Sequence, residues 1–258
     1  FRACFSDITK KISANKIVSN FIRDKIKRIV KDKHIAKILT DFGHPFTTKR
    51  PTLNTNYFEI FNRKNVQLVD LKTNPIIKIT KKGIKTKNEE LKFDKIIFAT
   101  GYDALTGPIL SLNLTGRKNI KLKKYWKNGP KTFLGIMIPN FPNFFVISGP
   151  GSPSVLTNVP AQIEQHVEWI SKFIKHLEKV GCSKVEPGIK ETENWVNEIN
   201  ILANKSLFMK AKNSWYKGDN IPGKPKKFIP YPAGLPQYRE ICNKVQKKMY
   251  KGFNISLK

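Results

Sequence analysis

The segment Lys95–Asp103, KIIFATGYD, constrains the fold of this chain more than any other stretch. Its short apolar run, Ile96–Thr100, ends at once in a Gly-Tyr-Asp turn, which is typical of a strand buried on both faces of a parallel sheet. Gly101 lets the backbone turn sharply, and ligands of open α/β sheets bind at the carboxyl ends of such strands. A core strand followed by an ordinary turn would look the same. The segment therefore predicts an α/β fold and leaves a ligand open.

Composition indicates a folded domain without membrane spans or disulfides. The chain has 258 residues, 40% of them apolar, and no apolar run approaches the length of a membrane span. Its 3 cysteines are far apart and include no CxxC pair, so we expect no zinc site, no disulfide framework and a cytoplasmic location. No signal peptide is recognised, and because the chain begins with Phe1 we expect residues to precede it.

The formal net charge of +29 would suit a protein that binds nucleic acid or an anionic membrane. However, only seven of the 48 basic residues are arginines, the lysines are scattered, and no nucleic-acid-binding motif is present. Biased codon usage would also enrich lysine, together with isoleucine and asparagine. We therefore expect no specific nucleic-acid partner.

Hydrophobic periodicity predicts helices mixed with short strands. Helices are expected over 8–31, 34–39, 160–179, 188–205 and 236–250. The helix over 160–179 should face a core with Ile163, Val167, Ile170, Ile174 and Leu177. Strands are expected over 65–70, 76–79, 84–86, 95–100, 132–138 and 144–148, with the second and third forming a hairpin.

The residues that could carry chemistry form no familiar catalytic pattern. Gly149–Ser154, GPGSPS, leads from an expected strand into a helix, which favours a cofactor-facing turn, although it is neither GxGxxG nor GxSxG. The four histidines show no metal-ligand spacing, so no metal site is expected. His166 fits a packing or capping histidine better than a base.

Several segments together resemble the C-terminal part of flavin-dependent Baeyer–Villiger monooxygenases of class B, the phenylacetone and cyclohexanone monooxygenase group. They are FIRDKIKRIVKD (21–32), TKRPTLNTNYFEIFNRKNVQLVDL (48–71), FATGYDALTG (98–107), FPNFFVISGPGSPS (141–154), IEQHVEWI (163–170), NSWYKGDNIPGKP (213–225) and YREIC (238–242). The family's two GxGxxG fingerprints and its FxGxxxHxxxW signature do not occur here. The resemblance therefore implies a chain that lacks the N-terminal half of such an enzyme.

The resemblance implies a fold class, α/β, and more narrowly the C-terminal portion of a flavoprotein with two Rossmann-like domains, for FAD and for NADP. On this basis residues 1–46 would end a helical insertion of the NADP domain. Residues 47–95 would be the returning part of that domain, and 96–258 the returning part of the FAD domain.

The implied activity is a Baeyer–Villiger oxygenation that uses FAD, NADPH and O2. One oxygen atom enters next to a ketone carbonyl and gives an ester or a lactone, through a flavin peroxide that Arg50 stabilises. A planar, permanently charged guanidinium suits that role. The missing N-terminal part would be required, and the protein would be a monomer with a small-molecule ketone substrate.

Further site residues follow from the same resemblance. Lys49, Arg50 and Trp215 would contact NADP, with Lys49 at the 2′-phosphate. Gly101, Asp103, Asn158 and Val159 would lie on the FAD side, although Val159 departs from the methionine expected there. Ser154, Val155 and Leu156 would line the substrate pocket.

Two other functions stay open. A related flavin enzyme could oxygenate nitrogen or sulfur, although the KRP and GPGSPS segments count against it. A lysine-rich binding protein without catalysis could also derive from a flavoprotein fragment.

Overall fold

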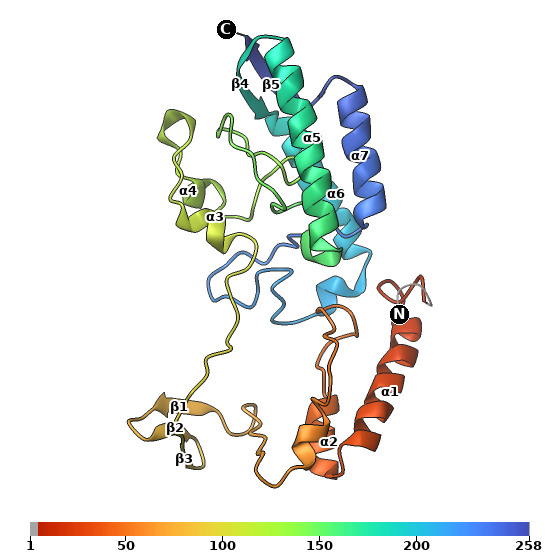
Figure 1. Ribbon diagram of the computed structural model, residues 1–258, viewed down its shortest axis with the longest axis vertical. Helices are drawn as coiled ribbons and strands as arrows, with labels where there is room; N and C mark the ends of the chain where they lie inside the picture. Colours follow the sequence, from red (N-terminus) through yellow and green to blue (C-terminus); the bar gives the residue numbers. More distant parts are fainter. Residues whose placement is uncertain (1–4, 258) are drawn as a thin grey trace. The chain divides into compact units, whose positions relative to one another are not determined.

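The computed structural model describes residues 5–257, and the chain divides into two compact units, Phe1–Gly101 and Tyr102–Lys258 (Figure 1). The first unit contains α1 (Ile12–Ile29), α2 (Lys33–Thr40), the short 3-10 helix η1 (Glu59–Asn62), and strands β1 (Ile76–Ile79), β2 (Gly83–Thr86) and β3 (Glu90–Lys92). The second contains α3 (Gly107–Ser111), η2 (Arg117–Asn119), α4 (Leu122–Tyr125), η3 (Ser154–Leu156), α5 (Val159–Lys179), β4 (Cys182–Pro187), α6 (Ile189–Asn204), η4 (Leu207–Lys210), α7 (Leu235–Lys247) and β5 (Phe253–Leu257).

In the first unit, α1 and α2 form a helical pair, as their apolar periodicity predicts. Buried Ile26, Val30 and Ala36 pack at its centre. The Asp32 carboxylate caps α2 by accepting hydrogen bonds from the backbone N–H groups of residues 34 and 35, at 2.7 and 2.9 Å. The apolar contact and the cap together set where the second helix begins.

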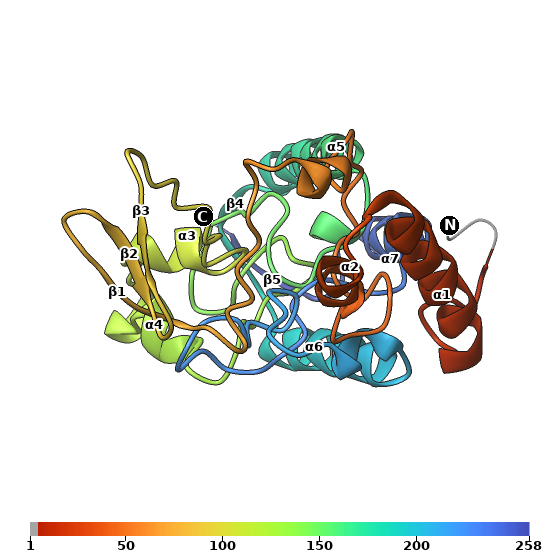
Figure 2. The ribbon, with the colours of Figure 1, turned by 90° about the horizontal axis from the view of Figure 1, so that it is seen from below.

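The three strands of the first unit form an antiparallel sheet in the order β1-β2-β3 (Figure 2). Ile79 pairs with Ile84, which confirms the hairpin expected between 76–79 and 84–86. The strand expected over 65–70 is wrong, because no regular strand forms there and a turn begins at Asp70, whose carbonyl accepts from the Thr73 and Asn74 N–H groups.

The strand expected over 95–100 does not form either. These residues carry no regular secondary structure, and Ile97 and Phe98 are 89% and 68% exposed. A strand needs a neighbouring strand to bond its backbone N–H and C=O groups. No described strand of this chain pairs with 95–100, so the apolar run stays extended and exposed.

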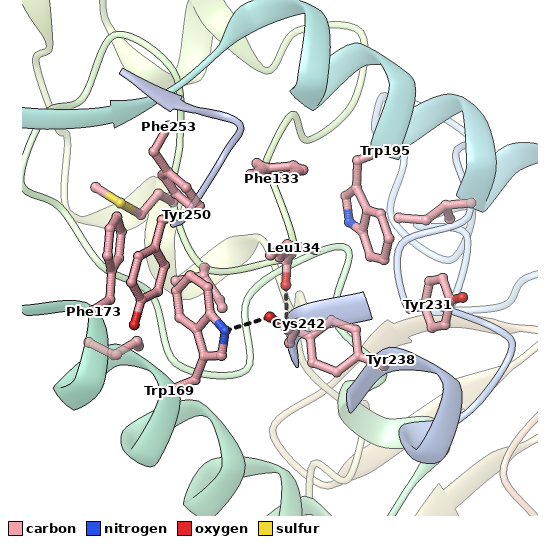
Figure 3. Packing of buried hydrophobic residues seen from close by; sticks show 14 of the residues in the cluster. Phe133, Leu134, Trp169, Phe173, Trp195, Tyr231, Tyr238, Cys242, Tyr250 and Phe253 are labelled. Carbon is pink, nitrogen blue, oxygen red and sulfur yellow. Dashed lines mark hydrogen bonds between the residues drawn. The ribbon is translucent and has the colours of Figure 1, made fainter. Parts of the chain in front are cut away.

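The second unit has an aromatic core between its helices. Trp169 and Phe173 of α5 pack around Tyr250 and Phe253, with ring centroids 4.2 Å apart for Phe173 and Tyr250 (Figure 3). The Trp169 indole N–H donates to the Cys242 carbonyl of α7 at 2.9 Å, which ties α5 to α7. Burial of such large rings dominates the stabilisation of a core.

The helices expected over 160–179, 188–205 and 236–250 are confirmed as α5, α6 and α7. The expected core face of α5 is confirmed at Ile170 and Leu177, which are both 8% exposed, and is wrong at Ile163, Val167 and Ile174, which are 38–44% exposed. The buried face carries Gln162, Gln165, His166, Trp169, Ile170, Phe173 and Leu177. Polar residues can occupy this face because hydrogen bonds satisfy part of their polar atoms.

The strands expected over 132–138 and 144–148 are also wrong. The segment folds back on itself through isolated bridges, Phe133 with Met137 and Met137 with Phe145. Gly135 turns the chain at φ 70°, in space too small for a Cβ atom. The residues are apolar because they lie in the core, where Leu134 is fully buried. The two-stranded antiparallel sheet of β4 and β5 was not predicted from the sequence.

Within the described residues, no helix has both the length and the apolar character that a membrane span requires.

Candidate active site

The segment that carries Lys49 and Arg50 begins in a tightly held turn of the first unit. The buried Asn15 side chain of α1 donates to the Phe46 carbonyl at 2.8 Å and accepts from the Phe46 N–H at 2.9 Å. Thr48, fully buried, folds back so that its hydroxyl donates to the Pro45 carbonyl at 2.6 Å. The chain is therefore anchored immediately before the two candidate cations.

Lys49 is half-buried and Arg50 is exposed, and the backbone from Arg50 to Asn54 carries no regular secondary structure. No ion pair involves either side chain in the part of the chain that the structure describes. Nearby His44 has a pKa lowered from its ordinary value, mainly by burial, and the charge of Lys49 adds to this. Two adjacent cationic side chains therefore follow an anchored turn of the backbone.

Gly101 and Asp103 follow the exposed apolar segment. Gly101 has φ +86° and open space where a Cβ atom would stand. In the second unit, the Asp103 carboxylate forms an ion pair with Lys224, whose ammonium group is also 3.4 Å from the Ala104 carbonyl. Asp103 is thus held by Lys224 of the IPGKP segment, a role that was not predicted from the sequence.

The loop Ser148–Leu156 is held in place by hydrogen bonds from several parts of the second unit. The Gly151 N–H donates to the Ile229 carbonyl at 2.8 Å, and the Trp195 indole N–H donates to the Gly151 carbonyl at 3.1 Å. Ser154 is buried with φ +46°, an uncommon conformation for a residue with a side chain. Val155 and Leu156 are half-buried against the aromatic core. The loop is therefore a fixed feature of this unit.

Asn158 and Val159 lie where this loop enters α5. Asn158 is the N-cap, and its side chain accepts from the Ala161 N–H at 3.3 Å. Asn158 is exposed and Val159 is half-buried, so both can meet a ligand.

Trp215 sits in a turn held by a buried ion pair. Lys217 and Asp219 approach to 3.0 Å with side chains only 10% and 9% exposed. The Asp219 carboxylate also accepts from the Ser214 N–H, and the Lys217 ammonium group is 3.3 Å from the Met209 carbonyl. Trp215 is half-buried and meets Tyr216 edge to face at 4.7 Å between ring centroids. The turn thus presents a rigid aromatic side chain.

Buried polar atoms without a partner lie close to the candidate residues along the chain. Among the described side chains, such oxygens occur on Thr47, Thr106, Ser148, Gln162, Gln165 and Ser214. Thr47, Thr106 and Ser214 are within three residues of Lys49, Asp103 and Trp215 respectively. Buried polar groups are nearly always hydrogen-bonded, so these oxygens are exceptions among the described side chains.

His166 of α5 is fully buried and was expected to be a packing or capping residue, which its surroundings confirm. Burial lowers its pKa to about 4, against a smaller opposing contribution from the Val146 backbone. The ring is therefore neutral at neutral pH. In the described residues, no group of His, Cys, Asp and Glu could hold a metal ion.

The lowered pKa of His166 predicts acid lability. Between pH 6.5 and about 4 the unfolded chain binds a proton that the folded chain does not, so stability falls as pH falls through this window. The contribution is up to about 1.4 kcal/mol per pH unit. Urea unfolding between pH 7 and 4.5 should show a shallower pH slope for His166→Asn. The exposed His34→Asn is the control, and an unchanged slope in His166→Asn would contradict this origin.

The chain is similar in sequence to known monooxygenases over nearly its whole length. No family model matches the chain. A Baeyer–Villiger monooxygenase of Pseudooceanicola batsensis is 41% identical over 247 residues, 95% of this chain and 44% of that protein. Cyclohexanone 1,2-monooxygenase of an Acinetobacter species is 38% identical over 254 residues, 98% of this chain and 46% of that protein. A phenazine N-monooxygenase of Lysobacter antibioticus is 37% identical, over 96% of this chain and 45% of that protein.

Solved structures agree in fold. An oxidised steroid monooxygenase bound to NADP superposes with a TM-score of 0.91 at 38% identity, over 100% of this chain and 48% of that one. A closed cyclohexanone monooxygenase gives 0.94 at 36%, over 98% and 47%. The structure titled OTEMO, complexed with FAD and NADP, gives 0.93 at 33%, over 98% and 46%.

The chain therefore has the fold of part of an α/β flavoprotein monooxygenase. More narrowly, it resembles flavin-dependent Baeyer–Villiger monooxygenases, and it spans about half the length of the curated relatives it matches.

Proposed function

We propose that this chain is the C-terminal part of a Baeyer–Villiger monooxygenase that uses FAD, NADPH and O2 to convert a ketone into an ester or a lactone. The observation that carries the proposal is the end-to-end match, at 38–41% identity, with ketone monooxygenases of about twice this length. The TM-scores of 0.91 and 0.94 support the same assignment. A flavin reduced by NADPH would supply the activation of dioxygen.

Arg50 is the candidate catalytic residue. Oxygen insertion next to a carbonyl places negative charge on oxygen atoms during the reaction, and a fixed guanidinium stabilises such charge with two parallel donors. The exposed Arg50 side chain is free of ion pairs within the described residues. It can therefore face a reacting group without first breaking a contact. Lys49 would contact the NADP 2′-phosphate through a charge-assisted hydrogen bond.

The second unit would supply the ketone pocket and one side of the cofactor site. Ser154, Val155 and Leu156 would line the pocket, on a loop that is already fixed. Trp215 would lie near the nicotinamide, held by its turn. Asn158, Val159, Gly101 and Asp103 would lie on the FAD side, where backbone turns allow close approach. The phosphate-binding glycine fingerprints are absent from this chain, so it would hold only part of each cofactor site.

The exposed segment around Phe98 supports the view that activity requires a further part of the enzyme. Ile97, Phe98 and Tyr102 are 89%, 68% and 89% exposed, although the sequence of this segment is typical of a buried strand. A sheet in the part of such an enzyme that this chain does not match would pair the backbone of this segment and cover its side chains.

Oxygenation of nitrogen is the second candidate. It is favoured by the phenazine N-monooxygenase, which is 37% identical over 252 residues. The two activities differ in product, because an N-oxide keeps the carbon skeleton intact.

Reconstitution tests the proposal. The 258-residue chain alone should purify colourless, because the glycine-rich phosphate-binding turns are absent. Joined to the part of Acinetobacter cyclohexanone 1,2-monooxygenase that it does not match, it should bind flavin stoichiometrically and turn yellow. That hybrid should form an ester or a lactone from cyclic ketones, detected by gas chromatography. A yellow preparation of the chain alone, or a flavin-loaded hybrid without ester, would contradict the proposal.

A further inference from the structure

His166 connects the start of the loop Ser148–Leu156 to the core of the second unit. Its ring makes hydrogen bonds at both nitrogens. It also stacks on the Tyr238 ring at an interplanar angle of 26°, with centroids 5.6 Å apart. Nδ1 is 3.2 Å from the Ser148 N–H nitrogen, and Nε2 is 2.8 Å from the Tyr238 hydroxyl. Tyr238 in turn contacts the Leu134 carbonyl (Figure 3). Three parts of the chain, distant in sequence, therefore meet at one imidazole.

The direction of each hydrogen bond follows from its donor. A backbone N–H can only donate, so Nδ1 must accept from Ser148 and carry no proton. In the neutral ring the proton is then on Nε2, which donates to the Tyr238 oxygen. The Tyr238 hydroxyl donates to the Leu134 carbonyl. The tautomer with its proton on Nε2 satisfies these three contacts, and the pKa of about 4 keeps the ring in its neutral form. Two weaker contacts oppose this tautomer: the Gln162 amide nitrogen, which can only donate, lies 3.4 Å from Nε2, and a hydrogen bond with the Val146 backbone raises the pKa of the ring.

The loop needs such support because two of its residues have unfavourable backbone conformations. Ser148 and Ser154 both have positive φ values, 55° and 46°, although both carry side chains. Such conformations persist only where the surroundings determine them. One turn before His166 on α5, Gln162 gives a second support by donating to the Ser152 hydroxyl at 2.8 Å, and that hydroxyl donates to the Gly149 carbonyl at 2.7 Å.

We propose that His166 is a positioning residue, which holds the loop Ser148–Leu156 in the conformation that receives the ketone. Its Nδ1 fixes the first residue of the loop, and its Nε2 orients the ring against Tyr238. The assignment of a ketone to this loop rests on the proposed function. The positioning of the loop itself rests only on contacts within this chain.

Two variants of equal polarity separate the two nitrogens. The amide oxygen of Asn falls near Nδ1 of the histidine it replaces, whereas the amide of Gln reaches the position of Nε2. His166→Asn therefore keeps an acceptor for the Ser148 N–H, and His166→Gln loses it. Hydrogen exchange of peptides covering Ser148–Ser152 should accelerate about 10- to 100-fold in His166→Gln and by less than about threefold in His166→Asn, since one buried hydrogen bond separates them. Equal exchange in both variants would overturn the proposal.

The tautomer can be measured without a substitution. Nitrogen-15 NMR of the histidine-labelled chain at neutral pH should show His166 with its proton on Nε2. A proton on Nδ1 would remove the hydrogen bond to Ser148 and overturn the proposal. This result does not depend on whether any variant folds.

The flavin-loaded hybrid enzyme supplies the functional readout. His166→Gln should oxidise NADPH at the parent rate but divert at least about tenfold more of it to hydrogen peroxide, while His166→Asn stays close to the parent. Faster hydrogen exchange in the loop of His166→Gln, without more hydrogen peroxide formed per NADPH oxidised, would show that the loop does not receive the ketone. That result would overturn this part of the proposal. If the parent hybrid makes no ester, the proposed function fails, and exchange and NMR still decide the role of His166 in the loop.

Discussion

Asp219→Asn is expected to lower the free energy of unfolding of this chain by about 3–5 kcal/mol, because it leaves the Lys217 ammonium group buried without a counter-charge. Both side chains are about nine-tenths buried, and they approach to 3.0 Å. The substitution keeps an oxygen that can accept from the Ser214 N–H, so it isolates the loss of charge. Urea unfolding followed by tryptophan fluorescence would measure the change.

An exposed ion pair of the same chain provides the control. Lys72 and Asp41 approach to 2.6 Å with side chains 67% and 61% exposed, so Asp41→Asn should leave the unfolding midpoint unchanged. The double variant Lys217→Met with Asp219→Ala should recover most of the stability lost in Asp219→Asn, because no charge remains buried. An equal loss of unfolding free energy in Asp41→Asn and Asp219→Asn would show that burial does not determine the size of the loss.

Arg50→Ala in the flavin-loaded hybrid should fold, bind FAD and accept electrons from NADPH, but form ester at least about 10²–10³-fold more slowly than the parent. The reason is electrostatic, because only a fixed cation offsets a full negative charge where water is excluded. Arg50→Lys should restore little of the ester formation, since an ammonium group lacks the planar pair of donors. NADPH oxidation should continue and give hydrogen peroxide.

Arg63→Ala is the matched control for this prediction, since Arg63 is also an exposed arginine of the first unit. It should leave ester formation unchanged. Ester formation by Arg50→Ala at the parent rate would remove Arg50 from the mechanism. It would also weaken the assignment of roles to the Thr48–Pro51 segment.

The helices of this chain could be predicted from its sequence because local periodicity determines them. The helices α5, α6 and α7 begin and end within a few residues of expectation, and the β1–β2 hairpin follows from its turn residues. Periodicity was less informative about the face that is buried. On α5 it favoured Ile163 and Val167, whereas Gln162 and His166 are buried and make hydrogen bonds with residues outside the helix.

The strands were harder to predict because their stability depends on partners elsewhere. The apolar run Ile96–Thr100 has the sequence of a central strand but finds no pairing strand in the described residues. The apolar residues at 132–138 pack in a folded-back core segment, so the expected strand was wrong there. Pairing between β4 and β5 joins segments about 70 residues apart, which no local pattern reveals.

The sequence likewise indicated some features of the candidate site and not others. Sequence resemblance selected Arg50, Lys49, Trp215 and the Ser154–Leu156 loop, whose roles remain predictions. It did not reveal the groups that hold them, such as Asp219, which accepts from the N–H of Ser214, next to Trp215 in the chain. The spacing of Gln162 and His166, four residues apart on one helix, was the available signal, since residues at that spacing share a face.

Isotope labelling tests the central claim most directly. The hybrid of this chain with the unmatched part of cyclohexanone 1,2-monooxygenase would be supplied with NADPH, cyclohexanone and ¹⁸O₂, and the product analysed by mass spectrometry. The account predicts a lactone with one ¹⁸O atom, located in the ring next to the carbonyl, while the carbonyl oxygen remains unlabelled. An unlabelled lactone, or consumption of NADPH with no lactone from a fully flavin-loaded hybrid, would contradict it.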